Sequence, residues 1–413
     1  MEPSLPAETR IGVTYPQGYR AAGVKAGIKA SGNEDVCILM SDRPAAVAGA
    51  FTANRFAAPS VLYDRAVVGG GRPVRAVVIN SGNANASTGE QGVADTRAMV
   101  EAAGEALGVA PEEVLVSSTG RIGIPLPMDK IAAGIQDAAK ALRPDGGGDA
   151  MKAIMTTDTR PKREHRELSV GGATVRIGGM AKGAGMIAPR LRPAGPPHAT
   201  MLAYLTTDAD VDPDFLRECL VGSLDQSFNR ITVDGDCSTN DTVLALANGV
   251  AGNEPLSAVH PDAPAFATAF TEVASSLARQ MVLDGEGATR FVEVVVSGAR
   301  NRDEARRCAE TIANSLLCKT AWFGGDPNWG RVIDAAGYSG AELDPARVSL
   351  HYGTTPIVRN GVDAGTPESE QAAAVKGEQI VVRLDLAVGD ATFTMWTCDL
   401  SYEYVRINAE YTT

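Results

Sequence analysis

Residues 181–208 read AKGAGMIAPRLRPAGPPHATMLAYLTTD, a glycine-rich loop and a proline-rich passage that lead into a strand-like run. Within them, the junction Ala199-Thr200 places a small residue before a hydroxyl nucleophile. If the chain cuts its own backbone there, Thr200 gains a free α-amine with an ordinary pKa of roughly 7.7 to 8.0, which can accept the proton of its own hydroxyl. The junction thus favours a self-activating threonine, although Ala-Thr is also found where an ordinary loop enters a strand.

The chain on both sides of this junction alternates between strand and helix patterns. Short β-rich runs broken by glycine lie before about residue 90, at 36–40, 46–51, 60–63 and 76–79. Helical spacing of apolar residues follows, and beyond Thr200 the pattern predicts helices over 212–225, 262–283 and 304–317 and a hairpin joining 381–386 to 392–397. This mixed order predicts a layered α/β (α+β) fold rather than a helical bundle or a barrel.

The composition limits the functions that the protein can have. The 413 residues are 44% hydrophobic and 21% charged, which suffices for two or three domain-sized cores. Lys and Arg number 38 against 50 Asp and Glu, and this net charge of -12 disfavours nucleic acid and anionic membranes as partners. Residues 1–8 lack the basic start and apolar core of a signal peptide, and no later segment holds about 18 uninterrupted apolar residues, so we expect a cytoplasmic protein.

Neither the 6 cysteines nor the 4 histidines indicate a metal site. The cysteines are scattered with no Cys-x-x-Cys pair, and no histidine lies at metal-ligand spacing from them. The histidines also lack an acidic partner at a useful spacing, so we assign none of them a catalytic role. We therefore expect free thiols, no metal and no resident cofactor.

Seven motifs span the chain nearly end to end, namely Asn80–Asn85, Ser118–Gly123, Met155–Thr159, Asp236–Thr242, Asp284–Gly287, Asp326–Arg331 and Ile407–Thr413. Taken with the loop and junction above, they resemble the ornithine acetyltransferases, or glutamate N-acetyltransferases, of arginine biosynthesis. In that family Ala-Thr follows the proline of the loop within a few residues, whereas here residues 190–198 intervene. This lengthening lies next to the scissile bond and bears on cleavage and on substrate access.

The resemblance implies a fold like that of the aminopeptidases and acetyltransferases that resemble N-terminal-nucleophile hydrolases. Self-cleavage would give an α chain of residues 1–199 and a β chain of residues 200–413 that share one core, with a smaller C-terminal lobe within about 295–413. The assembly would hold two α and two β chains. The implied activity is acetyl transfer from N-acetylornithine to glutamate through an acetyl-threonine. No residue pattern marks acetyl-CoA as a further donor, and the sequence leaves that donor open.

The same resemblance assigns catalytic roles to particular residues. Thr200 is the nucleophile, and Thr119 with Gly120 matches the pair that binds the oxyanion of acyl transfer. Physically, a Thr-Gly turn after a strand offers a hydroxyl and a backbone N–H together, and glycine permits close approach. Lys182 would hold the α-carboxylate of an amino-acid substrate. Without the resemblance, the sequence would equally suit a plain turn at Thr119-Gly120 and a solvated surface side chain at Lys182.

Thr157, Glu286, Asn408 and Thr413 complete the implied substrate-binding set. Thr156 stands beside Thr157, so the sequence leaves open which hydroxyl faces the substrate. Glu286, flanked by glycines, would meet the side-chain amine of ornithine or steer protons, although a lone glutamate there is usually exposed. The tail that holds Asn408 and Thr413 would otherwise be read as a frayed end. We interpret the motifs at 236–242 and 326–331 as structural.

Other functions also fit the sequence. An amidase or aminopeptidase of related fold would use water as the acyl acceptor, and a related acyltransferase would serve specialised metabolism. A third alternative is a protein that binds a small molecule without catalysis. An assay with N-acetylornithine, with and without glutamate, separates the enzymes from one another.

The junction at Ala199-Thr200 generates the first prediction. We expect the wild type to divide into two chains and Thr200→Ala to remain whole, because the variant lacks the hydroxyl that would attack the preceding carbonyl. Intact mass spectrometry of both purified proteins measures this. A wild type that stays a single chain, or a Thr200→Ala variant that still divides there, would contradict the prediction.

Overall fold

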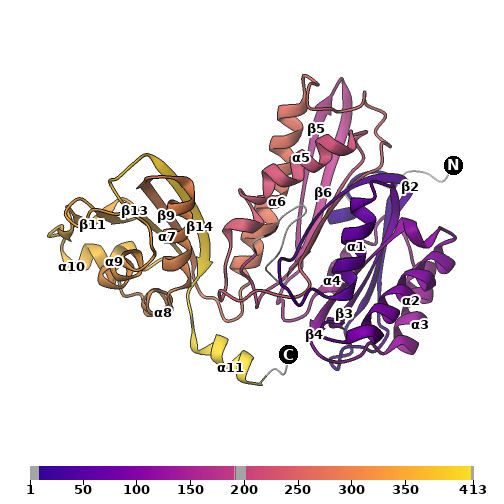
Figure 1. The fold of residues 1–413 in the computed structure, drawn as a ribbon, viewed down its shortest axis with the longest axis horizontal. Coiled ribbons are helices and arrows are strands. Elements are labelled where there is room, and N and C mark those ends of the chain that lie inside the picture. The colour runs from indigo at the N-terminus through magenta and orange to yellow at the C-terminus, as the bar shows by residue number, and fades with distance from the viewer. Residues whose placement is uncertain (1–8, 190, 192–200, 411–413) are drawn as a thin grey trace. The chain divides into compact units, whose positions relative to one another are not determined.

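The computed structural model describes residues 9–189, 191 and 201–410, and the chain forms two compact units (Figure 1). Of the described residues, those up to Asn229 and Asp236–Met281 form unit 1, and Arg230–Gly235 and those from Val282 onward form unit 2. Both units combine strands with helices, which confirms the predicted mixed α/β class. The predicted cut between Ala199 and Thr200 lies outside the described residues.

Unit 1 is built on an eight-stranded sheet with the order β4-β3-β2-β8-β7-β6-β5, in which β1 also pairs with β2. Its strands are β1 (Tyr19–Val24), β2 (Val36–Phe51), β3 (Val74–Asn83), β4 (Val114–Arg121), β5 (Lys162–Val170), β6 (Ala173–Lys182), β7 (Leu202–Thr207) and β8 (Thr242–Ala247). One buried apolar cluster takes side chains from β2, β3 and β4 as well as from β6, β7 and β8. The two halves of the sheet therefore share a core.

Strand β2 joins the two halves because it changes partner along its length. Val36–Met40 pair with β3, and Ala46–Phe51 pair with β8. Between them the register shifts, and Asp42, Arg43 and Pro44 are exposed. Proline has no N–H to donate to a strand ladder, so Pro44 favours a break in pairing at this point. The two short runs expected at 36–40 and 46–51 are thus one continuous strand.

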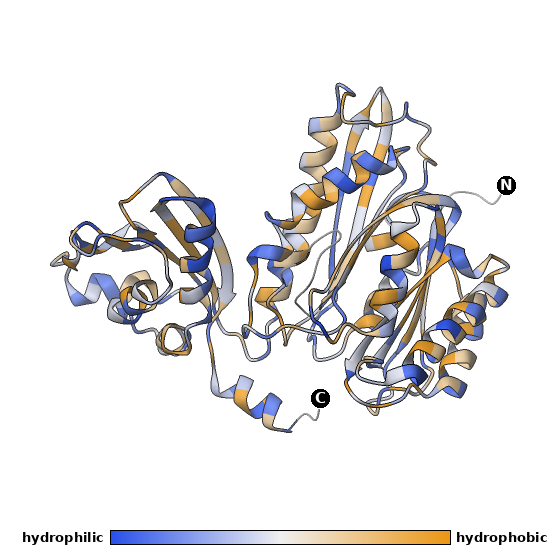
Figure 2. Cartoon of the chain, in the orientation of Figure 1, coloured by the Kyte–Doolittle hydropathy of each residue, from blue (hydrophilic) through white to orange (hydrophobic). Residues whose placement is uncertain are grey.

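Helices cover the outside of unit 1. Their bounds are α1 (Pro59–Gly69), α2 (Gly89–Leu107), α3 (Met128–Lys140), α4 (Gly147–Ile154), α5 (Pro213–Leu224) and α6 (Ala263–Leu283). Ile131, Ile135 and Ala138 of α3 are buried with apolar residues of β2, β3 and β4, as their helical spacing predicts. Figure 2 shows the result: hydrophobic colour concentrates on the strands, and the outer helices carry hydrophilic stripes.

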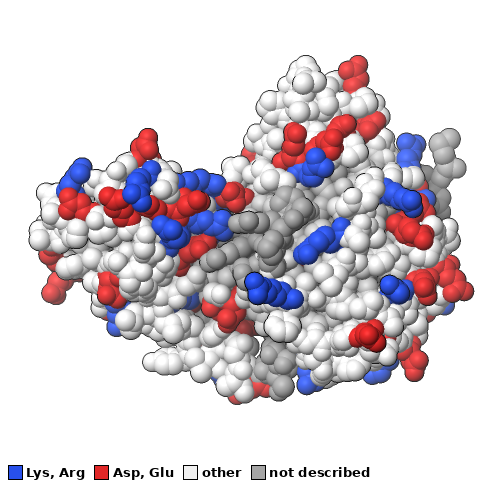
Figure 3. All heavy atoms as spheres, in the orientation of Figure 1, with Lys and Arg blue, Asp and Glu red and all other residues white. Residues whose placement is uncertain are grey.

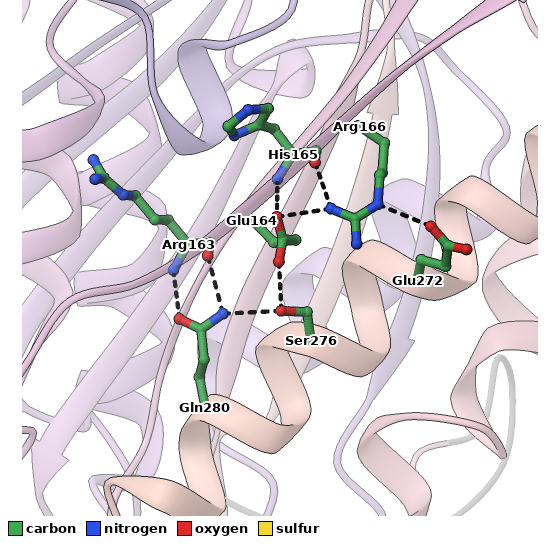
Figure 4. Close-up of polar contacts among 7 residues, drawn as sticks. All are labelled: Arg163, Glu164, His165, Arg166, Glu272, Ser276 and Gln280. Carbon is green, nitrogen blue, oxygen red and sulfur yellow. Dashed lines mark hydrogen bonds and ion pairs between the residues drawn. The ribbon is translucent and has the colours of Figure 1, made fainter.

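Side chains of α6 cover the edge strand β5 (Figure 4). The amide of Gln280 accepts from the N–H of Arg163 at 3.1 Å and donates to its carbonyl at 3.0 Å. Gln280 therefore takes the place of a neighbouring strand. Ser276 donates to Glu164 at 2.6 Å, and Arg166 pairs with Glu272 at 2.8 Å. Gln280 thus satisfies the backbone of the edge strand at Arg163, where another chain could otherwise pair.

Unit 2 has its own six-stranded sheet with the order β12-β11-β10-β13-β9-β14 and its own buried core. The strands are β9 (Phe291–Ala299), β10 (Ser349–Tyr352), β11 (Thr355–Arg359), β12 (Val362–Asp363), β13 (Gln379–Asp385) and β14 (Ala391–Cys398). The helices are α7 (Arg302–Asn314), α8 (Leu316–Gly324), α9 (Trp329–Gly337), α10 (Glu368–Ala374) and α11 (Tyr402–Glu410). On the face of this unit drawn in Figure 3, acidic side chains lie beside basic ones.

Three sequence expectations differ from the structure for identifiable reasons. The run at 60–63 lies in helix α1, because Pro59 suits a first helical turn and the buried carboxylate of Asp64 accepts from Val116 N of β4. The strands expected to form a hairpin, β13 and β14, do not pair with each other, because β9 lies between them. The helix expected over 304–317 is divided at Ser315, which caps α8.

No helix among the described residues is long and apolar enough to cross a membrane.

Candidate active site

The predicted oxyanion pair lies where β3 and β4 end side by side. These strands are parallel, and Ser81 pairs with Thr119 and Gly82 with Gly120. A Cβ added to Gly120 would lie 2.4 Å from the backbone carbon of Gly82, and its φ of 129° favours glycine. A side chain at this position would clash with the backbone of β3, so the position requires glycine. The predicted role of Gly120 in the oxyanion pair also depends on such close approach of the backbone.

Lys182 connects this pair to the second half of the sheet. It ends β6 and pairs in register with Leu202 of β7, two residues beyond Thr200 in the chain. Its side chain is 3% exposed, and its Nζ donates to Thr156 Oγ1 at 2.7 Å and to Thr119 Oγ1 at 3.3 Å. A hydroxyl that accepts from an ammonium keeps its own hydrogen to donate, so Thr119 remains able to bind an oxyanion.

The structure thus brings Lys182 to the Thr119-Gly120 pair, although Lys182 and Thr119 are 63 positions apart in the chain. It also distinguishes the two neighbouring threonines, because Lys182 contacts the hydroxyl of Thr156 and not that of Thr157. Ala199, Thr200 and Thr413 lie outside the described residues. Of the inserted residues 190–198, the structure describes Leu191 alone, whose N–H and carbonyl both bond the buried side chain of Asn229.

Asp158 holds the Thr156 turn and the end of β6 in place. Its Oδ1 accepts from Lys162 Nζ at 2.6 Å and from Gly183 N at 2.7 Å, while its Oδ2 accepts from Thr156 N at 3.0 Å. The side chains of Asp158 and Lys162 are fully buried. Burial alone would raise the pKa of this carboxyl, but the charges of Lys162 and Lys182 and the bond from Gly183 together lower it. Asp158 is therefore ionised.

Asp241 is the opposite case. It is fully buried, and neither carboxyl oxygen has a hydrogen-bond partner among the described residues. The nearby hydroxyl of Thr52 donates instead to Ser238 O at 2.6 Å. Burial raises the pKa of Asp241 well above its ordinary value, and the positive charge of Lys182 opposes this shift without cancelling it. The folded environment thus shifts Asp241 toward its protonated form.

Lys29 is a second lysine near the pair, and the sequence reading missed it. Its Nζ donates to Glu34 O at 2.5 Å and to Ala153 O at 3.2 Å, and its side chain lies against Gly82. Burial, together with the charge of Lys182, lowers the pKa of Lys29 to about 8 despite the opposing charge of Asp35. No spacing signal marks Lys29, because the contacts that shift its pKa come from distant segments.

In unit 2, two other predicted site residues, Glu286 and Asn408, are hydrogen-bonded to each other. Asn408 Nδ2 donates to Glu286 Oε2 at 2.8 Å and to Tyr404 O at 3.0 Å within α11. Glu286 is buried rather than solvent-exposed, and Ser401 Oγ donates to Gly287 O at 2.6 Å, which anchors the start of the tail. The described part of the tail is therefore a helix bonded to Glu286 and not a frayed end. Within the described ranges, no three His, Cys, Asp or Glu side chains are grouped to hold a metal.

Comparison with known proteins identifies the relatives of this chain. A model of the ArgJ family matches residues 20–413. An arginine biosynthesis bifunctional protein ArgJ from Symbiobacterium thermophilum is 50% identical over 404 residues, which cover 97% of this chain and 98% of the relative. The protein of the same name from Geobacter sulfurreducens is 47% identical over 398 residues, covering 96% and 99%.

Solved structures give similar matches over part of the chain. An arginine biosynthesis bifunctional protein from Bacillus halodurans is 42% identical with a TM-score of 0.48, and covers 50% of this chain and 97% of its own. An ornithine acetyltransferase from Mycobacterium tuberculosis, solved in complex with ornithine, is 45% identical with a TM-score of 0.41, and covers 46% and 98%.

The buried pair of Asp158 and Lys162 predicts a large loss of stability on removal of one charge. We expect Asp158→Asn to lower the free energy of unfolding by about 3–5 kcal/mol, because Lys162 is left as an uncompensated buried charge. Asp137→Asn is the control, since its pair with Lys140 is exposed and should contribute about 1 kcal/mol or less. Denaturant unfolding of both variants measures this, and equal losses would contradict it.

The buried carboxyl of Asp241 predicts a pH-dependent effect. Its pKa is raised in the folded state, so the unfolded chain releases its proton first, at a pH of about 4, and Asp241 costs stability increasingly as the pH rises. We expect the stability of Asp241→Asn relative to the wild type to increase from about pH 5 upward, by at most about 1.4 kcal/mol per pH unit. Denaturant unfolding across this range checks it, and a difference independent of pH would contradict it.

Proposed function

The chain belongs to the ArgJ family and is an acetyltransferase of arginine biosynthesis, and from this premise we propose that it moves the acetyl group of N-acetylornithine to the amine of glutamate. The contact that supports the proposal most directly is that of Lys182 with Thr119 and Thr156. It gathers a cation and two hydroxyls in a buried site next to the strand that follows Thr200.

In the first half-reaction, the hydroxyl oxygen of Thr200 attacks the acetyl carbonyl of N-acetylornithine. The α-amine of Thr200 takes the hydroxyl proton, and the carbonyl oxygen becomes an oxyanion. The hydroxyl of Thr119 and the N–H of Gly120 stabilise that oxyanion. When the intermediate collapses, the C–N bond breaks, the departing nitrogen takes the proton from the α-amine, and ornithine leaves an acetyl ester on Thr200.

In the second half-reaction, glutamate enters and its amine attacks the ester. The same two donors stabilise the second oxyanion, the C–O bond breaks, and the proton from the glutamate amine returns to Thr200 through the α-amine. Lys182 pairs with the α-carboxylate that both amino acids carry, so one cation serves donor and acceptor in turn.

The remaining parts of the proposal rest on family membership. Thr157, Glu286, Asn408 and Thr413 contribute to substrate binding, and the cut precursor assembles as two α and two β chains. Acetyl-CoA would acetylate the same Thr200 as an alternative donor. The enzyme would act in the cytoplasm without a resident cofactor.

A single nucleophile that serves two substrates predicts ping-pong kinetics. We expect parallel double-reciprocal plots when N-acetylornithine is varied at several fixed glutamate concentrations, because ornithine leaves before glutamate binds. Mass spectrometry of the enzyme incubated with N-acetylornithine alone should show an acetylated β chain. Thr119→Val is the comparison variant, and loss of its oxyanion donor should lower kcat about 100- to 1000-fold.

Two results would contradict the proposal. Intersecting plots without an acetylated β chain indicate direct transfer in a ternary complex. Release of ornithine and acetate at the same rate with and without glutamate indicates an amidase, in which water is the acceptor.

A further inference from the structure

The side chain of Asn240 connects the start of β8 to the ends of β3 and β4. Its Nδ2 donates to Ser118 O at 2.8 Å and to Ala84 O at 2.6 Å. Ser118 immediately precedes Thr119 in β4, and Ala84 follows the last residue of β3. Asn240 is 1% exposed, so water does not compete for these bonds. One amide therefore binds the backbone of β4, which carries the predicted oxyanion pair, and the backbone just beyond the end of the neighbouring strand β3.

Asn240 is itself held rigidly. Its Oδ1 accepts from Thr239 Oγ1 at 2.6 Å, its N–H donates to Ser238 Oγ at 3.1 Å, and its carbonyl accepts from Thr242 Oγ1 at 3.1 Å. These three hydrogen bonds restrain both the side chain and the backbone of Asn240.

The next residues extend the connection to β7. Thr242 begins β8, pairs in parallel register with Leu202, and donates its N–H to Met201 O at 2.9 Å. Asn240 thus lies two residues from a backbone bond to Met201, the first residue after the proposed nucleophile in the chain. The path from Ser118 through Asn240 to Met201 consists of hydrogen bonds and short covalent segments throughout.

From these contacts we infer that Asn240 is a positioning residue, which sets Thr119 and Gly120 relative to Met201 and strand β7, the segment that follows the proposed nucleophile in the chain. The inference rests on the proposed acyl-transfer function. A peptide group is planar, so a bond to the carbonyl of Ser118 fixes the orientation of the whole Ser118-Thr119 peptide. Oxyanion donors act only when held within about 0.5 Å of the productive geometry, and Asn240 supplies that restraint.

The chemistry of the contact requires an amide. Two carbonyl oxygens face Asn240, so the residue must present two N–H donors, and the hydroxyl of Thr239 requires one acceptor. Aspartate has the same shape but no N–H when ionised, and would set a carboxylate against two carbonyl oxygens. Alanine removes the donors without adding charge. The two substitutions therefore separate loss of the bonds from added repulsion.

Asn253 offers a matched control at the opposite end of strands β7 and β8. Its Nδ2 donates to Asp210 O at 3.1 Å and Glu254 O at 2.7 Å, its Oδ1 accepts from Asp210 N at 2.9 Å, and it is likewise buried. Asp210 follows the end of β7 and Asn253 follows the end of β8. Because a six-residue strand is roughly 20 Å long, Asn253 lies far from Thr119.

The test compares Asn240→Asp, Asn240→Ala and Asn253→Asp in the full-length, matured enzyme. Acetyl transfer from N-acetylornithine to glutamate and hydrolysis of p-nitrophenyl acetate are both measured, together with the thermal unfolding temperature. We expect both Asn240 variants to lose about 10- to 100-fold in kcat in both assays, with KM changed by less than about twofold, because the donors move while substrate binding persists. Asn253→Asp should keep the wild-type kcat even if its thermal unfolding temperature falls by as much as that of the Asn240 variants.

A folded Asn240→Ala with wild-type kcat, or an equal loss in Asn253→Asp, would overturn the inference. A loss confined to KM would overturn it too, since that would place Asn240 in substrate binding. If the wild type hydrolyses the ester but transfers nothing to glutamate, the proposed function fails, and the ester assay alone then decides on Asn240. If Asn240→Asp does not fold, Asn240→Ala supplies the same comparison without the added charge.

Discussion

The buried ion pair of Asp158 and Lys162 is the constraint on which the site in unit 1 depends. Both side chains are fully buried, so the carboxylate must take several bonds to offset its lost hydration. It takes three, from Lys162 Nζ, from Gly183 N at the end of β6 and from Thr156 N. Because these groups surround one charge, the ends of β5 and β6 and the Thr156 turn keep a fixed relation, and Lys182 is held against Thr119 and Thr156.

The two acids whose pKa values Lys182 influences, Asp158 and Asp241, are shifted in opposite directions. The charges of Lys162 and Lys182 and the backbone N–H groups of Gly183 and Thr156 lower the pKa of Asp158. Asp241 has no hydrogen-bond partner among the described residues, and its burial raises its pKa. An ionised Asp158 keeps its bonds to the backbone N–H groups of Gly183 and Thr156. Lys29, whose pKa falls to about 8, adds a cation that loses its charge only above neutral pH.

Local patterns in the sequence succeeded where local forces decide. The apolar spacing of α3, the extent of α5 and α6 and the mixed fold class follow from residues a few positions apart, and the structure bears them out. They failed where a distant strand intervenes. β13 and β14 resemble the arms of a hairpin, yet β9 separates them, and the run at 60–63 is helical although its residues also suit a strand. Pairing partners that lie far away in the chain leave no periodic signal.

The sequence by itself determined the family, through motifs that keep their order along the chain, and it singled out Thr119, Gly120 and Lys182 before any contact was known. Tertiary structure alone decided which threonine Lys182 contacts, which lysine Asp158 pairs with, and that Asn240 bonds the backbone behind Thr119. The physical reason is the same in each case. Burial, hydrogen-bond geometry and pKa depend on groups that folding brings from distant positions, and 122 residues of chain separate Asn240 from Ser118.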